Sequence, residues 1–195
     1  RHFIWSKYCQ DYDRTFAIMT KNLKPGYILG IGSNINPKIN VAKILSLLLT
    51  EFPTLMLSRI INIPPVGMNS HLHFLNVVVY IETDLAGKEL KSLCNNIETQ
   101  LGRDRDDPAS KIKDRTADLD ILFHAKSTAQ LLTPVSDITD EYFLYPLLEE
   151  LTAYLLENEP IIRQDGTQIQ LDGLRFGQTA TTIYRNADAS HKRAI

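Results

Sequence analysis

The sequence predicts an α+β domain in which helices cover one face of an antiparallel sheet. Three observations support this fold class: short apolar runs rich in β-branched residues, two longer segments with apolar residues at helical spacing, and the alternation of the two along the chain. The 195 residues, 44% of them hydrophobic and 23% charged, suffice for one globular domain with a sizeable core. From turn pairs and polar composition near both ends we expect an extension over 1–26, a domain over 27–156 and a C-terminal extension over 157–195.

The first half of the domain is predicted to contain a strand, a helix and two further strands. The first strand is the apolar run "YILGIGSN", which ends in a Gly-Ser-Asn turn. Asn36 can cap a helix whose first residue is Pro37, and apolar residues then recur at helical spacing as far as Pro53. The predicted strands of this half are 27–34, 55–63 and 74–83.

The second half is predicted to add a helix and a strand. Apolar residues at helical spacing over 84–102 indicate a helix that Gly102 ends, and 117–123 reads as a strand. The resulting order, βαββαβ, is the ferredoxin-like plan, which leaves one face of the sheet free. We expect the loops 64–73 and 103–116 beside that open face, and a further helix near 140–156 at one edge of the sheet.

Two aspartates interrupt the last predicted strand, in the stretch "KDRTADLDILF". Because side chains alternate along a strand, Asp118 and Asp120 share one face, while Leu119 lies on the other. Mg²⁺ prefers oxygen ligands and is often held by one or two carboxylates plus substrate phosphates. Basic residues that could contact phosphates lie just upstream: Arg103, Arg105, Lys111, Lys113 and Arg115. The pattern predicts an enzyme that handles Mg²⁺ and a polyphosphate; the alternative is a solvated strand face with ordinary ion pairs.

The segment "IPPVGMNSHLHFLN" (63–76) suggests a binding site for a flat ring. Phe74 and Asn76 are two positions apart and share a strand face, so they could stack on a heterocycle and hydrogen-bond it. Alternatively, Phe74 belongs to the core and Asn76 to a turn. A metal site at His71 and His73 is disfavoured, because no cysteine or third histidine lies nearby.

Charge and hydropathy argue against several classes of partner. A net charge of -2 and a pI near 6.2 give no reason to expect nucleic acid as the main partner. No apolar run approaches the roughly 20 residues of a membrane span, and the first residues do not resemble a secretory signal. The two cysteines fit neither a metal site nor a disulfide scaffold. We therefore expect a cytoplasmic protein that binds small molecules.

Several motifs together resemble those of a known enzyme family. "ILGIGSN", "PPVG" followed by "FLNVVVYIETDL", "IETQLGR" and "DRTADLDILF" occur in the order found in the folate-pathway pyrophosphokinases that act on 6-hydroxymethyl-7,8-dihydropterin. The resemblance covers residues 27 to 124 and, more loosely, "YFLYPLLEEL" up to 151. It implies the ferredoxin-like fold and transfer of the β,γ-pyrophosphoryl group of ATP to the pterin hydroxymethyl oxygen, with release of AMP and with two Mg²⁺ ions.

The resemblance also implies a role for individual residues. Those matching the metal-binding and catalytic positions are Asp118 and Asp120, together with the arginines Arg103 and Arg115. Those matching the pterin site are Pro64, Pro65, Val66, Phe74, Asn76 and Tyr142. Those expected at ATP are Glu98, Arg103, Lys111, Lys113 and Arg115.

The sequence departs from the family on the ATP side. Family members usually carry Trp and Gly-Pro before the second arginine, where this chain has "SKIKDRT", and a His and a later Arg are absent from "LTPVSDITDEYF". The chain would lose contacts to ATP there unless Lys111 or Lys113 replaces them. Three other interpretations therefore stay open: a non-catalytic relative that binds a pterin or nucleotide, an Mg²⁺-dependent phosphoryl transferase with another heterocyclic acceptor, and an unrelated α+β interaction domain.

Overall fold

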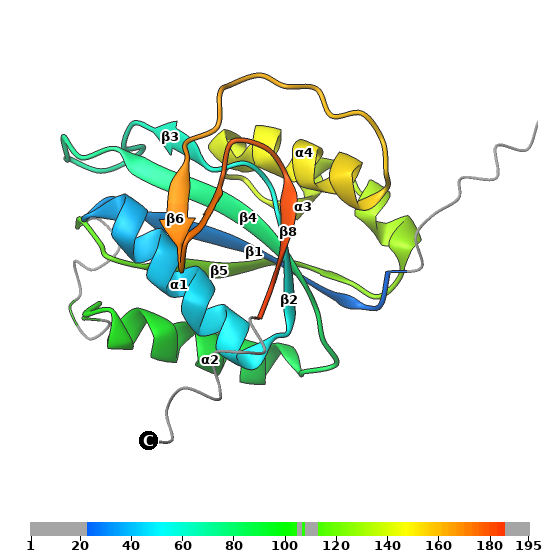
Figure 1. Cartoon of the computed structure of the whole chain (residues 1–195), viewed down its shortest axis with the longest axis horizontal. Coiled ribbons are helices and arrows are strands. Elements are labelled where there is room, and N and C mark those ends of the chain that lie inside the picture. Colours follow the sequence, from blue (N-terminus) through cyan, green and yellow to red (C-terminus); the bar gives the residue numbers. More distant parts are fainter. Residues whose placement is uncertain (1–22, 105–106, 108–112, 186–195) are drawn as a thin grey trace, which may run out of the picture.

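The computed structural model describes residues 23–104, 107 and 113–185 (Figure 1). As far as the aspartate strand its elements follow the predicted order, with one difference: the predicted strand 55–63 is two strands. Near Arg59 the backbone leaves the ladder with the neighbouring strand, and the Arg59 amide donates instead to the Glu150 carboxylate at 3.1 Å. The elements up to the aspartate strand are β1 (Gly26–Ser33), α1 (Pro37–Glu51), β2 (Thr54–Leu57), β3 (Ile61–Ile63), β4 (Phe74–Glu82), α2 (Gly87–Gln100) and β5 (Asp118–Ala125).

The remaining elements complete the described chain. They are η1 (Thr128–Leu132), α3 (Val135–Ile138), η2 (Tyr142–Leu144), α4 (Tyr145–Leu155), β6 (Ile169–Leu171), β7 (Leu174–Phe176) and β8 (Thr181–Tyr184). Within the described ranges, no helix has the length and apolar character needed to cross a membrane.

The main sheet is antiparallel with the strand order β5-β1-β4-β2-β8, and β3 pairs with β4 beside this path. The first four strands of this order reproduce the ferredoxin-like arrangement, so the predicted fold class is confirmed. β1 lies between β5 and β4, and all eight of its residues are buried. A strand can be buried along its whole length only if both faces of the sheet are covered around it.

The two faces carry separate apolar layers. α1 and α2 lie side by side over one face (Figure 1), where Leu29, Val79 and Leu119 join their core. α4 covers part of the other face and packs on Val78 and Tyr80. The expectation that this face is free, with the helix 140–156 at an edge, is therefore wrong. The leucines of the helix form an apolar stripe, which is most stable when it is buried on the sheet.

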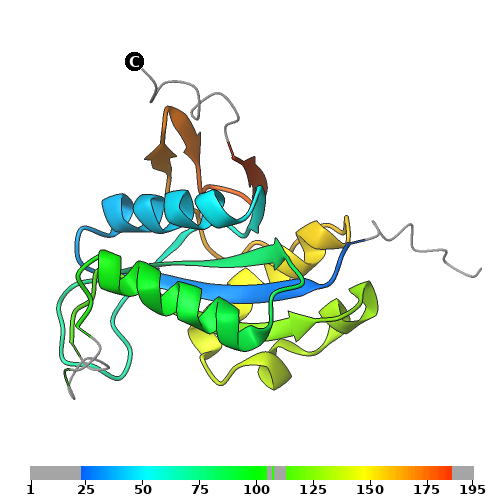
Figure 2. The ribbon, with the colours of Figure 1, turned by 90° about the horizontal axis from the view of Figure 1, so that it is seen from below.

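The segment after α4 contributes to the same structure. β8 pairs antiparallel with β2, placing Thr54 opposite Tyr184, and adds a strand to the sheet. β6 and β7 form a hairpin beside α1 (Figure 2), and Ile169 and Phe176 enter the core of that helix. At the other end of the chain, Leu23 is buried, whereas residues 1–22 of the expected N-terminal extension and 186–195 of the C-terminal one lie outside the described residues.

Candidate active site

A pocket of about 440 Å³ opens on the α4 side of the sheet, beside the region that this helix covers. It collects side chains from β1, β4 and β5, from α2 and from the chain just before α4. Its lining residues are Gly30, Ile31, Gly32, Ile63, Pro64, Val66, Met68, Phe74, Asn76, Glu98, Arg103, Arg115, Asp118, Asp120, Glu141, Phe143 and Leu144. Nine residues predicted from the sequence therefore meet in one cavity: Pro64, Val66, Phe74, Asn76, Glu98, Arg103, Arg115, Asp118 and Asp120.

The strand register sets the floor of this pocket. Gly32 on β1 lies opposite Asn76 on β4 and opposite Asp118 on β5. The Asn76 amide and the Asp118 carboxylate thus lie on either side of Gly32, which has no side chain. A Cβ atom built on Gly32 would lie 2.9 Å from the Asn76 Oδ1 atom and 3.6 Å from a ring carbon of Phe74. Glycine at this position therefore leaves the room that the Asn76 amide occupies.

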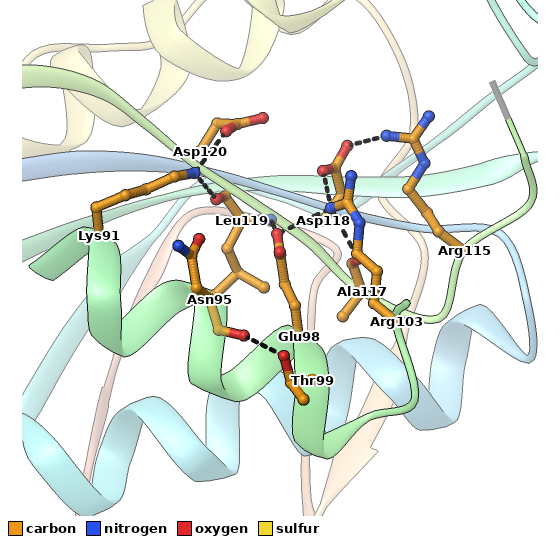
Figure 3. Close-up of polar contacts among 10 residues, drawn as sticks. All are labelled: Lys91, Asn95, Glu98, Thr99, Arg103, Arg115, Ala117, Asp118, Leu119 and Asp120. Carbon is orange, nitrogen blue, oxygen red and sulfur yellow. Dashed lines mark hydrogen bonds and ion pairs between the residues drawn. The ribbon is translucent and has the colours of Figure 1, made fainter. Parts of the chain in front are cut away.

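Two arginines neutralise Asp118 (Figure 3). Arg103 donates through Nη1 to one carboxylate oxygen, and the Arg115 Nη1 donates to the other at 2.8 Å. Burial by itself would lower the pKa of Arg103, but the carboxylates of Asp118, Glu98 and Asp120 outweigh it, so this pKa is raised above its usual value. Two aspartates two positions apart are tolerated on β5 because fixed cations lie beside them.

Glu98 anchors this arrangement from α2. Its side chain is 1% exposed, and its Oε1 atom accepts hydrogen bonds from Arg103 Nη1 at 2.9 Å and from the Leu119 backbone N–H at 2.7 Å. A buried carboxylate needs such partners, and these two link α2, the loop after it and the start of β5. Glu98 therefore positions Arg103 from within the protein, in addition to lining the pocket.

Asp120 has a different partner. Lys91 on α2 places its Nζ atom 3.0 Å from the Asp120 Oδ1 atom and 3.0 Å from the Leu119 carbonyl oxygen (Figure 3). The Asp120 side chain is 56% exposed, so water screens this pair and it contributes little to stability. The predicted basic residues did not include Lys91, because it precedes the aspartates by almost thirty residues and only the packing of α2 on β5 brings it near.

An apolar wall faces the charged groups. Phe74 and Asn76 on β4 are joined by Pro64 and Val66 from the loop after β3, and the Arg115 guanidinium lies over the Phe74 ring, 5.7 Å from its centroid. Asn76 is 7% exposed. An aromatic ring, an amide and a stiff proline loop can hold a flat, polar heterocycle by stacking and hydrogen bonding.

Asp114 joins the two loops that border the pocket. It accepts hydrogen bonds from Asn34 Nδ2 at 2.6 Å and from the Ser70 hydroxyl, while Asn34 Oδ1 accepts from the Arg115 backbone N–H at 2.7 Å. The loop 64–73 and the approach to β5 are thus bonded to each other and to the end of β1. This residue occupies one of the positions at which the sequence departs from the pyrophosphokinase motifs.

Some predicted site residues lie elsewhere. Tyr142 is 65% exposed and does not line the pocket, although its neighbours Glu141 and Phe143 do. Pro65 is not a lining residue either. Lys113 pairs with Asp107 and borders a smaller neighbouring cavity of about 180 Å³. Arg105 and Lys111 lie outside the described residues.

Sequence reasoning missed Glu141 and Phe143. Both belong to the short turn before α4, where no periodicity indicates which side chain points inward. The pKa of Glu141 is raised, first because burial disfavours its charge and then because Asp120 and Asp118 repel it, an effect that Arg115 partly offsets. Gly30 and Gly32 were also missed, although two glycines alternating on a buried strand are a recognisable signal of close approach.

The donor set suits a hard cation with few protein ligands. Asp118 and Asp120 offer carboxylate oxygens from one strand face, the ligand type that Mg²⁺ prefers. Among the described residues, no group of three His, Cys, Asp or Glu side chains is placed to hold a metal ion. Such a pair of carboxylates fits an Mg²⁺ ion whose remaining ligands come from phosphate oxygens and water.

Comparison with known proteins identifies relatives of the chain. The model of the family described as 7,8-dihydro-6-hydroxymethylpterin-pyrophosphokinase matches residues 28–153. A 2-amino-4-hydroxy-6-hydroxymethyldihydropteridine pyrophosphokinase of Bacillus subtilis (strain 168) is 32% identical over 129 residues, which cover 63% of this chain and 75% of that protein. Proteins of the same name from two strains of Porphyromonas gingivalis are 32% identical over 99 residues, covering 50% of this chain and 67% of theirs.

Proposed function

Because this chain belongs to the 7,8-dihydro-6-hydroxymethylpterin-pyrophosphokinase family, and is thus an ATP-dependent diphosphotransferase, we propose its full reaction and the residues that perform it. The β,γ-pyrophosphoryl group of ATP moves to the hydroxymethyl oxygen of 6-hydroxymethyl-7,8-dihydropterin, giving the pterin diphosphate and AMP. The observation that supports this proposal is the row Asn76, Gly32 and Asp118 across three adjacent strands, because an amide suited to a heterocycle and a carboxylate suited to Mg²⁺ then lie on one pocket floor.

The pterin binds at the apolar wall in this proposal. Phe74 supplies a ring face, Asn76 hydrogen-bonds the polar edge of the pterin, and Pro64, Pro65 and Val66 provide a stiff loop whose backbone meets that edge. Phe143, which lines the pocket, supplies a further aromatic surface. We propose this role for Phe143 alongside the predicted Tyr142, since the latter is mostly exposed in the structure.

The triphosphate binds on the side of the aspartates. Asp118 and Asp120 hold Mg²⁺, two ions in this proposal, which when bound neutralises phosphate charge and helps to activate the attacking hydroxyl. Arg103 and Arg115 then donate to phosphate oxygens in this proposal, while Glu98 keeps Arg103 in place. Guanidinium groups suit this task because they bind phosphate through paired hydrogen bonds. The two predicted lysines, Lys111 and Lys113, contact the nucleotide in this proposal.

The test of the proposed function is AMP release by the purified chain from ATP and Mg²⁺, measured with and without 6-hydroxymethyl-7,8-dihydropterin. We expect AMP only with the pterin, and pterin diphosphate in equal amount. Saturable pterin binding without AMP would instead favour the non-catalytic relative, and AMP formation with another heterocycle alone would favour a different acceptor. Omitting Mg²⁺ is expected to abolish turnover, which tests the metal requirement separately.

Gly32→Ala is expected to weaken pterin binding by about tenfold or more. Its Cβ would lie 2.9 Å from the Asn76 Oδ1 atom, so the amide must turn away from the position in which it meets the pterin. Losing one good hydrogen bond corresponds to about 1.5 kcal/mol. Fluorescence titration with the pterin measures this affinity.

Gly87→Ala at the start of α2 is the control, because its Cβ would meet only the Tyr27 hydroxyl at an ordinary 3.7 Å. An unchanged affinity in Gly32→Ala would remove Asn76 from the proposed pterin site.

A further inference from the structure

Residues 164–180, here called the C-terminal brace, are bonded to the short chain segment that leads into β3. The Ile60 backbone N–H donates to the Gly177 carbonyl oxygen at 2.8 Å, and the Ile60 carbonyl oxygen accepts from the Thr167 N–H at 2.6 Å. Two residues further on, the Gln164 side-chain Nε2 donates to the Asn62 carbonyl oxygen at 2.9 Å. β3 is therefore held by β4 through the sheet ladder and by the C-terminal brace through these bonds.

A buried ion pair fixes the same junction. Arg59 and Glu150 have side chains only 8% and 2% exposed, and their Nε and Oε2 atoms are 2.9 Å apart. The other Glu150 oxygen accepts from the Ala180 N–H at 3.2 Å, and Arg59 Nη1 donates to the Gln164 carbonyl oxygen. Because buried charges need several partners, this network restricts how the brace, α4 and the chain before β3 can lie.

Two glycines allow the close approach of the brace. Gly177 has φ 106°, in the region that favours glycine, and a Cβ there would collide with the Thr167 carbonyl oxygen and lie 3.0 Å from Ile60. A Cβ on Gly166 would in turn collide with the Gly177 carbonyl oxygen. The sequence of the brace thus suits this docking position on the core.

β3 connects the brace to the pocket. Ile63, its last residue, lines the pocket together with Pro64 and Val66 of the following loop. Within the sheet, Ile63 lies opposite Phe74, and Ile61 lies opposite Asn76. β3 has only three residues, so its ladder with β4 offers few bonds, and a shift of β3 would move the apolar wall.

We propose that Gln164 is a positioning residue for the pterin, acting through β3 and without contact to the substrate. Its hydrogen bond to Asn62 holds β3 in place. Ile63 and the part of the apolar wall formed by Pro64 and Val66 are thereby kept where the heterocycle binds. The inference rests on the proposed function for the identity of the ligand. It extends that function to a residue outside the matched family segment, which ends at residue 153.

The test compares Gln164→Ala with two other variants. Gln164→Ala removes the side-chain donor to Asn62 and keeps the backbone carbonyl that accepts a hydrogen bond from Arg59. Because the Gln164 side chain is exposed, the fold is expected to persist. Gln164→Lys restores a side-chain donor of similar reach. Gln168→Ala is the matched control, since Gln168 is an exposed residue of the same segment with no side-chain bond among those found in the described part of the chain.

Two readouts are measured for each variant. In steady-state kinetics, Gln164→Ala is expected to raise the KM for the pterin about threefold to tenfold, the loss of one hydrogen bond, with kcat and the KM for ATP unchanged. In hydrogen exchange without ligands, the amides of 61–63 and of Val66 are expected to exchange faster by a similar factor; Pro64 and Pro65 carry no amide hydrogen. Gln164→Lys should recover most of both effects, and Gln168→Ala should match the unaltered chain.

Unchanged pterin KM together with unchanged exchange would overturn the proposal. Equal changes in both KM values and in kcat would also overturn it, because they would indicate a general loss of structure. If the unaltered chain releases no AMP, the proposed function fails; the exchange of the amides of 61–63 and of Val66 in Gln164→Ala still decides whether the brace holds the wall.

Discussion

Asp118→Asn is expected to lower pterin-dependent AMP formation by about a thousandfold while leaving the pterin affinity within about threefold. The substitution keeps the shape of the side chain and removes the charge that pairs with Arg103 and Arg115 and that would hold Mg²⁺. Loss of one preorganised electrostatic group at developing phosphoryl charge typically costs two to three orders of magnitude in rate. The measurement is single-turnover AMP formation, with the pterin affinity determined separately by fluorescence.

Asp137→Asn serves as the control for this variant. Asp137 is an exposed aspartate on α3, and its carboxylate accepts a long hydrogen bond of 3.4 Å from the neighbouring Ser136 hydroxyl. Its turnover should equal that of the unaltered chain. Turnover of Asp118→Asn within a few-fold of the unaltered chain would show that another group holds the Mg²⁺, and the site assignment on β5 would be wrong.

Glu150→Ala is expected to lower the free energy of unfolding by about 3–5 kcal/mol. The substitution leaves the Arg59 guanidinium buried without its carboxylate. The backbone N–H groups of Arg59 and Ala180 also lose their acceptor. Chemical denaturation followed by circular dichroism measures the effect. Because the pair links α4 to the C-terminal brace, exchange of the amides in β8 should also accelerate.

The adjacent Glu149 provides a matched comparison. Its ion pair with Arg163 is exposed, with side chains 38% and 54% accessible, so Glu149→Ala should cost less than about 1 kcal/mol. Replacing Arg59 and Glu150 together by apolar residues of similar size should recover much of the stability lost in Glu150→Ala. Equal costs for Glu149→Ala and Glu150→Ala would mean that the buried pair does not hold the brace.

The elements that the sequence predicted correctly are those whose signals are local. The glycine and β-branched content of β1 and β4, and the apolar spacing in α1 and α2, specify each element within its own residues. The aspartate pair is equally local, since alternation on a strand places Asp118 and Asp120 on one face whatever surrounds them. These signals were enough for the fold class and for most of the pocket.

What could not be predicted depends on contacts between distant residues. The break between β2 and β3 arises where Arg59 meets Glu150, ninety-one positions later, and no pattern near Arg59 reveals that partner. Lys91 reaches Asp120 only through the packing of α2 on β5. Before α4, the choice between Tyr142 and Phe143 as the inward side chain depends on a single turn of 3₁₀ helix, which is too short to show periodicity.

The departures from the family motifs have a partial explanation in Asp114. From the sequence it was one of the unusual residues before the second arginine. In the structure it binds Asn34 and Ser70, and so ties the loop 64–73 to the residue that precedes Arg115. A carboxylate can accept from both groups at once, which neither glycine nor proline side chains can do.

The strand β8 has a consequence for how this protein tolerates shortening. β2 is held by β4 on one side and by β8 on the other, and Leu55 and Leu57 within it are fully buried. A chain that stopped soon after α4 would present an unpaired, strongly apolar strand edge, which invites pairing between molecules and aggregation. We therefore expect the cooperative folding unit to extend some thirty residues past the end of the segment that the family model matches, from residue 153 to Tyr184.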